Sequence, residues 1–183
     1  MKNKIIAVIG AGGKTTLIHR LAEEYRRKGA SVLVSTTTHM LVEPDTDLSC
    51  DSFAIMEKIK KTGYCMAGAV CPENSAKMQS LPEQMLHDLM KQVDYALIEA
   101  DGAKHYALKY PSEQEPVIPD GTTDVILVLG SWDLGKPCKD VVFRFEHMTS
   151  ALGISGDMKA DKQMLQWIWQ AYEEKLKNMD YQG

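Results

Sequence analysis

The chain has 183 residues, of which 44% are hydrophobic, and carries a formal net charge of −4. These values suit a single α/β domain over residues 1–183 with a full core, and the lack of a basic run argues against nucleic acid as a partner. Its apolar runs are too short to span a bilayer, so we expect no membrane partner. The N-terminus lacks a signal-peptide pattern, so we expect a cytoplasmic protein with four free cysteines.

Strands and helices alternate along the first half of the sequence. Three apolar side chains, Leu17, Leu21 and Tyr25, recur at helical spacing and are expected to form the core face of the first helix. In chain order we predict a strand over 5–9, a helix over 14–28, a strand over 31–35, an acidic loop over 44–51, a helix over 53–61 and a strand over 64–70.

The same alternation continues to the C-terminus. Ser80-Leu81-Pro82-Glu83 has the capping-box pattern that starts a helix. In chain order we predict a helix to residue 92, strands over 94–99 and 124–129 joined by a long proline-containing loop, and one helix over 157–179 with Leu165, Ile168, Tyr172, Leu176 and Met179 on one face. This pattern predicts an α/β fold whose mostly parallel sheet has helices on both faces and binds ligands at the carboxyl ends of its strands.

The most informative stretch is V-I-G-A-G-G-K-T-T, which follows the first predicted strand directly. Glycines bring backbone N–H groups close to phosphate oxygens, Lys14 can reach β- and γ-phosphates, and the Thr15 hydroxyl is a Mg²⁺ ligand type. We predict a loop for ATP or GTP with Mg²⁺, and hence a three-layer architecture like that of P-loop NTPases. Its residues are Gly10, Ala11, Gly12, Gly13, Lys14, Thr15 and Thr16.

This loop departs from the usual G-x-x-x-x-G-K-[ST] pattern, because Val8 stands at the position of the first glycine. One alternative is a plain glycine turn with a solvated Lys14. Another is a dinucleotide-binding loop, but Thr15 replaces its third glycine and the second strand ends in Thr instead of an acidic residue.

Two further strand ends carry candidate chemistry. The second strand runs into T-T-T-H, where the Thr37 hydroxyl could help bind Mg²⁺ and His39 is more often structural than a base. The strand over 94–99 ends in E-A-D-G, the arrangement of a Walker-B strand. We predict Glu99 as a metal ligand, Glu99 or Asp101 as the group that orients water, and Gly102 as a close turn near the γ-phosphate.

Three sets of motifs together resemble the YqeC-like family of accessory proteins of selenium-dependent molybdenum hydroxylases. They are the glycine loop with T-T-T-H-M, E-A-D-G-A-K with L-K-Y-P and E-P-V-I-P, and L-G-K-P with F-R-F-E. The resemblance implies a P-loop NTPase-like fold and a role in maturing a molybdenum hydroxylase or handling its cofactor. Family members usually have His where this chain has Phe143, and they continue past residue 183 with a segment suited to reading a guanine base.

We therefore expect a Mg²⁺-dependent accessory protein that hydrolyses a nucleoside triphosphate or switches with it, with Lys14, Glu99 and Asp101 as catalytic groups. One alternative is a phosphoryl transferase whose small acceptor is held by Lys104 and Lys109. Another is a module that binds a nucleotide or a molybdopterin cofactor without chemistry.

Overall fold

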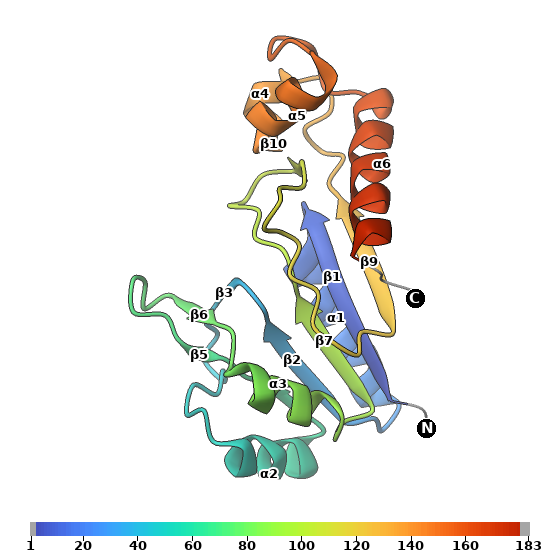
Figure 1. Ribbon diagram of the computed structural model, residues 1–183. Helices are drawn as coiled ribbons and strands as arrows, with labels where there is room; N and C mark the ends of the chain where they lie inside the picture. Colours follow the sequence, from blue (N-terminus) through green and yellow to red (C-terminus); the bar gives the residue numbers. More distant parts are fainter. Residues whose placement is uncertain (1–2, 180–183) are drawn as a thin grey trace. The chain divides into compact units, whose positions relative to one another are not determined.

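A five-stranded, mostly parallel β-sheet is the central element of the computed structural model, which describes residues 3–179 (Figure 1). The spatial order of its strands is β4-β2-β7-β1-β9. The strands are β1 (Lys4–Ala11), β2 (Val32–Thr36), β4 (Tyr64–Met66), β7 (Tyr95–Glu99) and β9 (Asp124–Leu129). The strand that leads into the glycine loop therefore neighbours the strand that ends in Glu99, and the two pair in parallel. The predicted α/β class is confirmed.

The chain divides into two compact units. Unit 1 comprises residues 1–8, 15–100 and 117–126, and unit 2 comprises residues 9–14, 101–116 and 127–183. The glycine loop belongs to unit 2, whereas Thr15 and Glu99 belong to unit 1.

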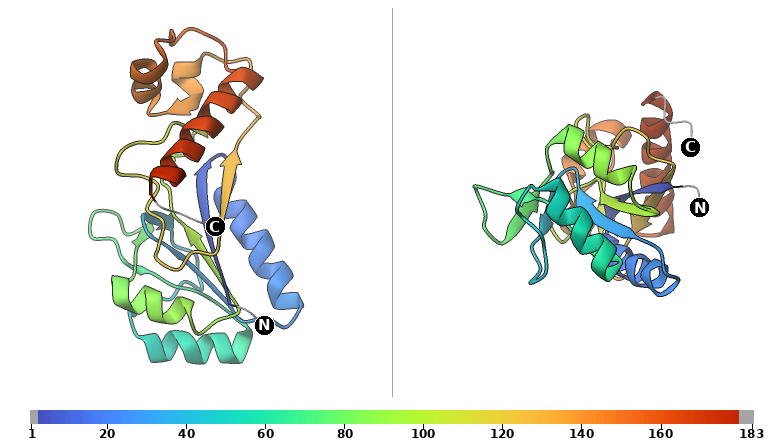
Figure 2. Two further views of the ribbon diagram at one scale, coloured as in Figure 1. Left: turned by 45° about the vertical axis from the view of Figure 1, so that its right-hand side comes forward. Right: turned by 90° about the horizontal axis from the view of Figure 1, so that it is seen from below.

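In unit 1, helices cover both faces of the sheet, as predicted. Helix α1 (Lys14–Arg27) lies on one face, and α2 (Ser52–Thr62) and α3 (Glu83–Met90) lie on the other (Figures 1 and 2). Apolar residues of α2 and α3 pack against alternate residues of the strands, because side chains of a strand point to opposite faces in turn. This core includes Ile5, Leu33, Ile55, Ile59, Cys65, Leu86, Leu89, Ala96 and Ile98.

The buried face of α1 is rotated from the predicted one. Ile18 and Ala22 are buried, whereas Leu17, Leu21 and Tyr25 are only half-buried. Tyr25 instead stacks on Tyr95, with ring centroids 3.7 Å apart. The periodicity is correct, but the helix turns Ile18 toward the sheet.

The predicted strand over 64–70 is wrong as one element. β4 ends at Met66, and β5 (Ala69–Val70) belongs to a separate antiparallel sheet with β6 (Lys77–Gln79) and β3 (His39–Leu41) in the order β3-β6-β5. The chain changes sheet at Gly68, where a Cβ atom would stand 2.6 Å from the sulfur of Met78. Such a close approach requires glycine.

The predicted capping box before α3 does not form. Pro82 precedes the helix without a side-chain cap, and the Ser80 hydroxyl donates to the carbonyl of Leu81 at 2.9 Å. α2, in contrast, is capped by Asp51, whose carboxylate accepts from the N–H groups of Phe53 and Ala54. α3 ends at Met90, two residues before the predicted end.

Unit 2 contains short elements that the sequence pattern missed, together with the predicted last helix. The short elements are β8 (Leu108–Lys109), α4 (Cys138–Val141), β10 (Val142–Phe143) and α5 (Phe145–Leu152), and β8 pairs in parallel with β10. The predicted last helix is α6 (Lys162–Asn178).

The last helix begins at Lys162, not at residue 157, because Asp161 caps it by accepting from Met164 N–H at 3.0 Å. The residues just before it are engaged elsewhere: Lys159 bridges to Pro137. Met164, Ile168 and Tyr172 form the buried face of α6, and the predicted face residue Met179 is exposed. No helix within residues 3–179 is both long and apolar enough to cross a membrane.

Candidate functional site

The glycine loop makes a sharp connection between β1 and α1. β1 continues to Ala11 and α1 begins at Lys14, so only Gly12 and Gly13 lie between them. Gly10 and Gly12 have φ of +86° and +79°. A Cβ atom at Gly10 would stand 2.2 Å from the Val128 carbonyl oxygen, and one at Gly12 would stand 2.4 Å from that of Ala107. Glycine is required at both positions by conformation and by space.

Lys14 folds back over this loop. Its Nζ donates to the carbonyl of Gly10 at 2.9 Å, and the residue is 5% exposed. The interpretation of Lys14 as a solvated surface lysine is therefore wrong. The ammonium group instead lies against the loop backbone, where a cation can meet the charge of a phosphate.

In unit 1, Thr15 and Glu99 meet at the carboxyl end of β7. The Thr15 hydroxyl, in the first turn of α1, donates to Glu99 Oε2 at 3.0 Å, and Glu99 is 6% exposed. Glu99 is the last residue of a strand paired on both sides, opposite Val8 of β1 and Thr36 of β2. A hydroxyl and a carboxylate held together are the oxygen donors that Mg²⁺ prefers.

The threonines after β2 support this strand end through hydrogen bonds. The Thr36 hydroxyl donates to the carbonyl of Glu99 at 2.7 Å, and Thr37 N–H donates to the same oxygen at 3.1 Å. The Thr37 hydroxyl donates to the Val117 carbonyl at 2.7 Å. Thr36 therefore fixes the backbone of Glu99, while the predicted ligand Thr37 holds the segment after residue 116. His39 begins β3 and is exposed.

The second carboxylate of E-A-D-G has a different environment, within unit 2. Asp101 is fully buried, and its Oδ2 accepts from Gly10 N–H at 3.0 Å and from the Tyr172 hydroxyl at 2.5 Å. Its Oδ1 accepts from the Lys109 ammonium. The predicted role of Asp101 in orienting water remains a prediction. In this structure its Oδ2 holds the glycine loop and α6, and its Oδ1 is paired with Lys109.

A buried ionic network surrounds Asp101. Lys109 is fully buried and also donates to the Gly102 carbonyl and to Glu115, each at 2.6 Å. Glu115 in turn pairs with Arg144 at 2.8 Å. Burial and the adjacent Asp101 carboxylate hold the pKa of Tyr172 well above its usual value, so its hydroxyl remains a donor. Charges buried in this way are costly to leave unpaired, so the network fixes the loop firmly.

Of the two lysines that were predicted to hold an acceptor, Lys104 is exposed and Lys109 is fully buried. Glu115 and Arg144 were not among the predicted site residues, and Tyr172 was predicted only as part of a helix face. A signal was present for the first two, because Glu115 and Arg144 lie in E-P-V-I-P and F-R-F-E, which carry the family resemblance.

Unit 1 also contains a cavity of about 560 Å³ beside Thr37. This is the volume range of small-molecule sites. Its polar lining includes the side chains of Glu83, His87 and Asp120. The complete lining is Thr37, Ser80, Glu83, Gln84, Leu86, His87, Met90, Val117, Ile118, Pro119 and Asp120.

These features define an α/β protein whose first parallel strand leads through a glycine loop into a helix that opens with Lys-Thr-Thr. The chain belongs to the YqeC family: the family described as YqeC protein matches residues 6–146. It is 34% identical over 161 residues to the Escherichia coli (strain K12) protein named "Uncharacterized protein YqeC". That match covers 84% of this chain and 62% of the relative, so the chain spans less than two thirds of the relative's length. No solved structure matches the chain.

Proposed function

We propose that this chain binds a nucleoside triphosphate together with Mg²⁺, and that it hydrolyses the nucleotide or switches with it. The glycine loop and Lys14 would hold the phosphates, and Thr15 and Glu99 would hold the metal ion. Mg²⁺ bound there would neutralise phosphate charge and polarise the γ-phosphoryl group.

The observation that carries this proposal is the contact between Thr15 and Glu99. Neighbouring ligands of an octahedral Mg²⁺ ion, each about 2.1 Å from the metal, lie about 3 Å apart. The two oxygens are 3.0 Å apart in this structure. The pair therefore already has the spacing that a shared ion would impose. The buried hydrogen bond from the Thr36 hydroxyl to the Glu99 carbonyl fixes the backbone from which this carboxylate projects.

We further propose that this activity serves the maturation of a selenium-dependent molybdenum hydroxylase. This part depends on the motif resemblance, whose blocks include Glu99, Asp101, Glu115 and Arg144. The last three of these residues form the buried network that supports the glycine loop.

A second candidate function is phosphoryl transfer to a small acceptor. The 560 Å³ cavity favours it, because this cavity is next to the T-T-T-H segment and offers Glu83, His87 and Asp120 as polar groups. The predicted acceptor ligand Lys109 is buried and paired with Asp101 and Glu115, so the cavity is the better place for an acceptor.

The test is calorimetric titration of ATP and GTP, each with Mg²⁺, into the wild type, Lys14→Ala, Glu99→Gln and the control Lys91→Ala. Lys91 is an exposed lysine at the end of α3. We expect Lys14→Ala to weaken binding by about 10- to 100-fold, because a charged hydrogen bond contributes about 1.5–3 kcal/mol. Lys91→Ala should bind like the wild type.

The outcomes separate the alternatives. Phosphate release that depends on Mg²⁺ supports hydrolysis, and tight binding without turnover supports a switch or a binding module. A phosphorylated product that forms only with an added acceptor supports transfer. A folded wild type that binds neither nucleotide overturns the proposal.

A further inference from the structure

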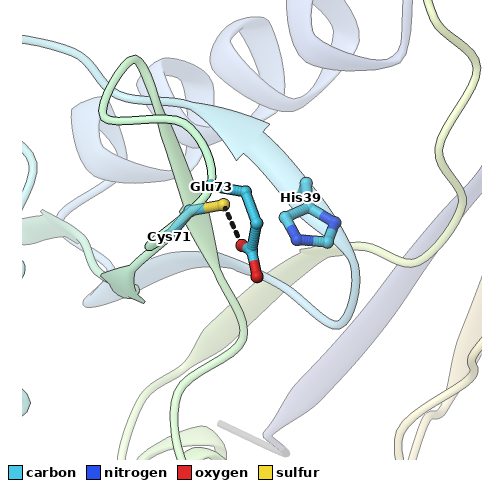
Figure 3. Close-up of side chains that lie close together, drawn as sticks. All are labelled: His39, Cys71 and Glu73. Atoms are coloured by element: carbon cyan, nitrogen blue, oxygen red, sulfur yellow. Dashed lines mark hydrogen bonds between the residues drawn. The ribbon is translucent and has the colours of Figure 1, made fainter.

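A separate cluster of metal-ligand side chains lies on the small antiparallel sheet of unit 1. His39, Cys71 and Glu73 bring an imidazole nitrogen, a sulfur and a carboxylate oxygen within 4.8 Å of one another (Figure 3). The function proposed above does not use any of these three side chains. We propose that they form a binding site for a borderline divalent transition-metal ion of the Zn²⁺ class.

The fold fixes two of the three donors in a single turn. Cys71 follows β5 directly, and Asn74 N–H donates to its carbonyl at 3.2 Å, which closes a turn that contains Glu73. His39 comes from the other edge strand of the same sheet, at the first position of β3. The sheet thus brings together residues that are more than 30 positions apart in the sequence.

The donors also differ usefully in burial. Cys71 is 3% exposed, whereas His39 and Glu73 are exposed, so an ion can enter from solvent and reach a shielded sulfur. The Cys71 thiol donates to Glu73 Oε2 at 3.4 Å. Figure 3 shows this contact, with the His39 ring beside the carboxylate. The Cys71 thiol therefore already contacts the Glu73 carboxylate, which would bind the same metal ion.

The chemistry of the donor set selects the ion. Sulfur and imidazole ligands suit Zn²⁺ and similar ions and disfavour Mg²⁺, which takes oxygen ligands. Tetrahedral bonds of about 2.0–2.3 Å space ligand atoms by roughly 3.3–3.8 Å. The donor atoms of the cluster lie within 4.8 Å of one another, and two of the three are on exposed side chains, so binding of the ion would draw these side chains inward. Binding converts the Cys71 thiol to a thiolate and releases its proton to solvent.

Three protein ligands leave a fourth position for water or an exogenous ligand. This is the coordination of zinc sites that act on a substrate, because structural sites use four protein ligands. We therefore assign the cluster an open site, chemically distinct from the Mg²⁺ site at Thr15 and Glu99.

The experiment uses Co²⁺ as a spectroscopic probe and Zn²⁺ as a competitor, without nucleotide. We expect one equivalent of Co²⁺ to give a thiolate-to-metal charge-transfer band in the near ultraviolet, and Zn²⁺ to abolish it. Cys71→Ser should remove the band. Cys50→Ser is the matched control, since Cys50 is a free, half-buried cysteine outside the cluster, and it should keep the band.

Glu73→Gln and His39→Ala test the site without disturbing a buried residue. Each should weaken Zn²⁺ binding by at least about 10- to 100-fold, the loss seen even for residues that only support a ligand. Unchanged Zn²⁺ affinity in both variants, a thiolate band that survives in Cys71→Ser, or a wild type that binds no Zn²⁺ overturns the proposal. None of these results depends on nucleotide binding.

Discussion

Two buried carboxylates only two positions apart in E-A-D-G have different hydrogen-bond partners. Glu99 ends a strand of unit 1, and its carboxylate accepts from the hydroxyl of Thr15. Asp101 belongs to unit 2 and accepts from Gly10, Lys109 and Tyr172 in a fully buried network. A hydroxyl can be shared with a metal ion, whereas a buried ammonium cannot be displaced without a large cost. Glu99 is thus suited to bind a ligand, and Asp101 to hold the structure.

The largest expected effect comes from Asp101→Asn. This change removes one of the carboxylates that pair with the buried Lys109 ammonium. It should lower the free energy of unfolding by about 3–5 kcal/mol. Chemical denaturation measures it. The control is Asp157→Asn, because Asp157 forms only an exposed pair with Lys139 and should change stability by less than about 0.5 kcal/mol. If Asp101→Asn and Asp157→Asn both changed the free energy of unfolding only slightly, Asp101 would not have the structural role that distinguishes it from Glu99.

Tyr172→Phe tests the same network with a smaller change. Loss of the hydroxyl bond to a charged carboxylate should lower the free energy of unfolding by about 1.5–3 kcal/mol. Tyr106→Phe, at an exposed tyrosine of the same unit, should be neutral.

Tyr172 also predicts a pH dependence. Its pKa in the folded protein is raised above the ordinary value of 10.0, mainly by burial. Stability from this group is therefore complete below about pH 10 and is lost as the pH rises toward the folded pKa. The unfolding free energy of Tyr172→Phe should lack this alkaline decline, and an identical decline in both proteins would contradict the assignment.

Glu99→Gln should show the reverse pattern. We expect the free energy of unfolding to fall by less than in Asp101→Asn, because the amide oxygen still accepts from Thr15. Mg²⁺-dependent nucleotide binding should weaken by about tenfold, or 1.4 kcal/mol, because a charged ligand is lost. Parallel denaturation and calorimetry decide this. A destabilised variant with unchanged nucleotide affinity would make Glu99 another structural carboxylate.

The smallest effect concerns a third carboxylate, Asp94. Its pKa is lowered from 3.8 by the N–H and then the hydroxyl of Ser31, each donating at 2.8 Å. A lowered pKa gives stability that is present above about pH 4 and is lost as the pH falls through the folded value. We expect the acid-induced fall in the free energy of unfolding to be about 1 kcal/mol smaller in Asp94→Asn than in the wild type. If the free energy of unfolding falls with pH in the same way in the wild type and in Asp94→Asn, Asp94 does not contribute to acid-dependent stability.

The sequence by itself determined the α/β class, the positions of the main strands and the glycine loop. Apolar runs such as the one over 5–9 specify buried strands because a parallel sheet is covered on both faces. Local chemistry also specified the end of α2, since Gly63 adopts a left-handed conformation there.

Only the tertiary structure decided what each charged residue does. The spacing in E-A-D-G is the same whether its acids face a metal ion or a lysine. The partners of Asp101 lie outside this motif: Lys109 is in β8 and Tyr172 is in α6. The same reason hid the His39, Cys71 and Glu73 cluster: the sequence pattern predicts a single strand over 64–70 where β5 lies, and no strand at β3 or β6. The burial of a residue and its long-range partners depend on how segments pack, and local sequence patterns do not specify that packing.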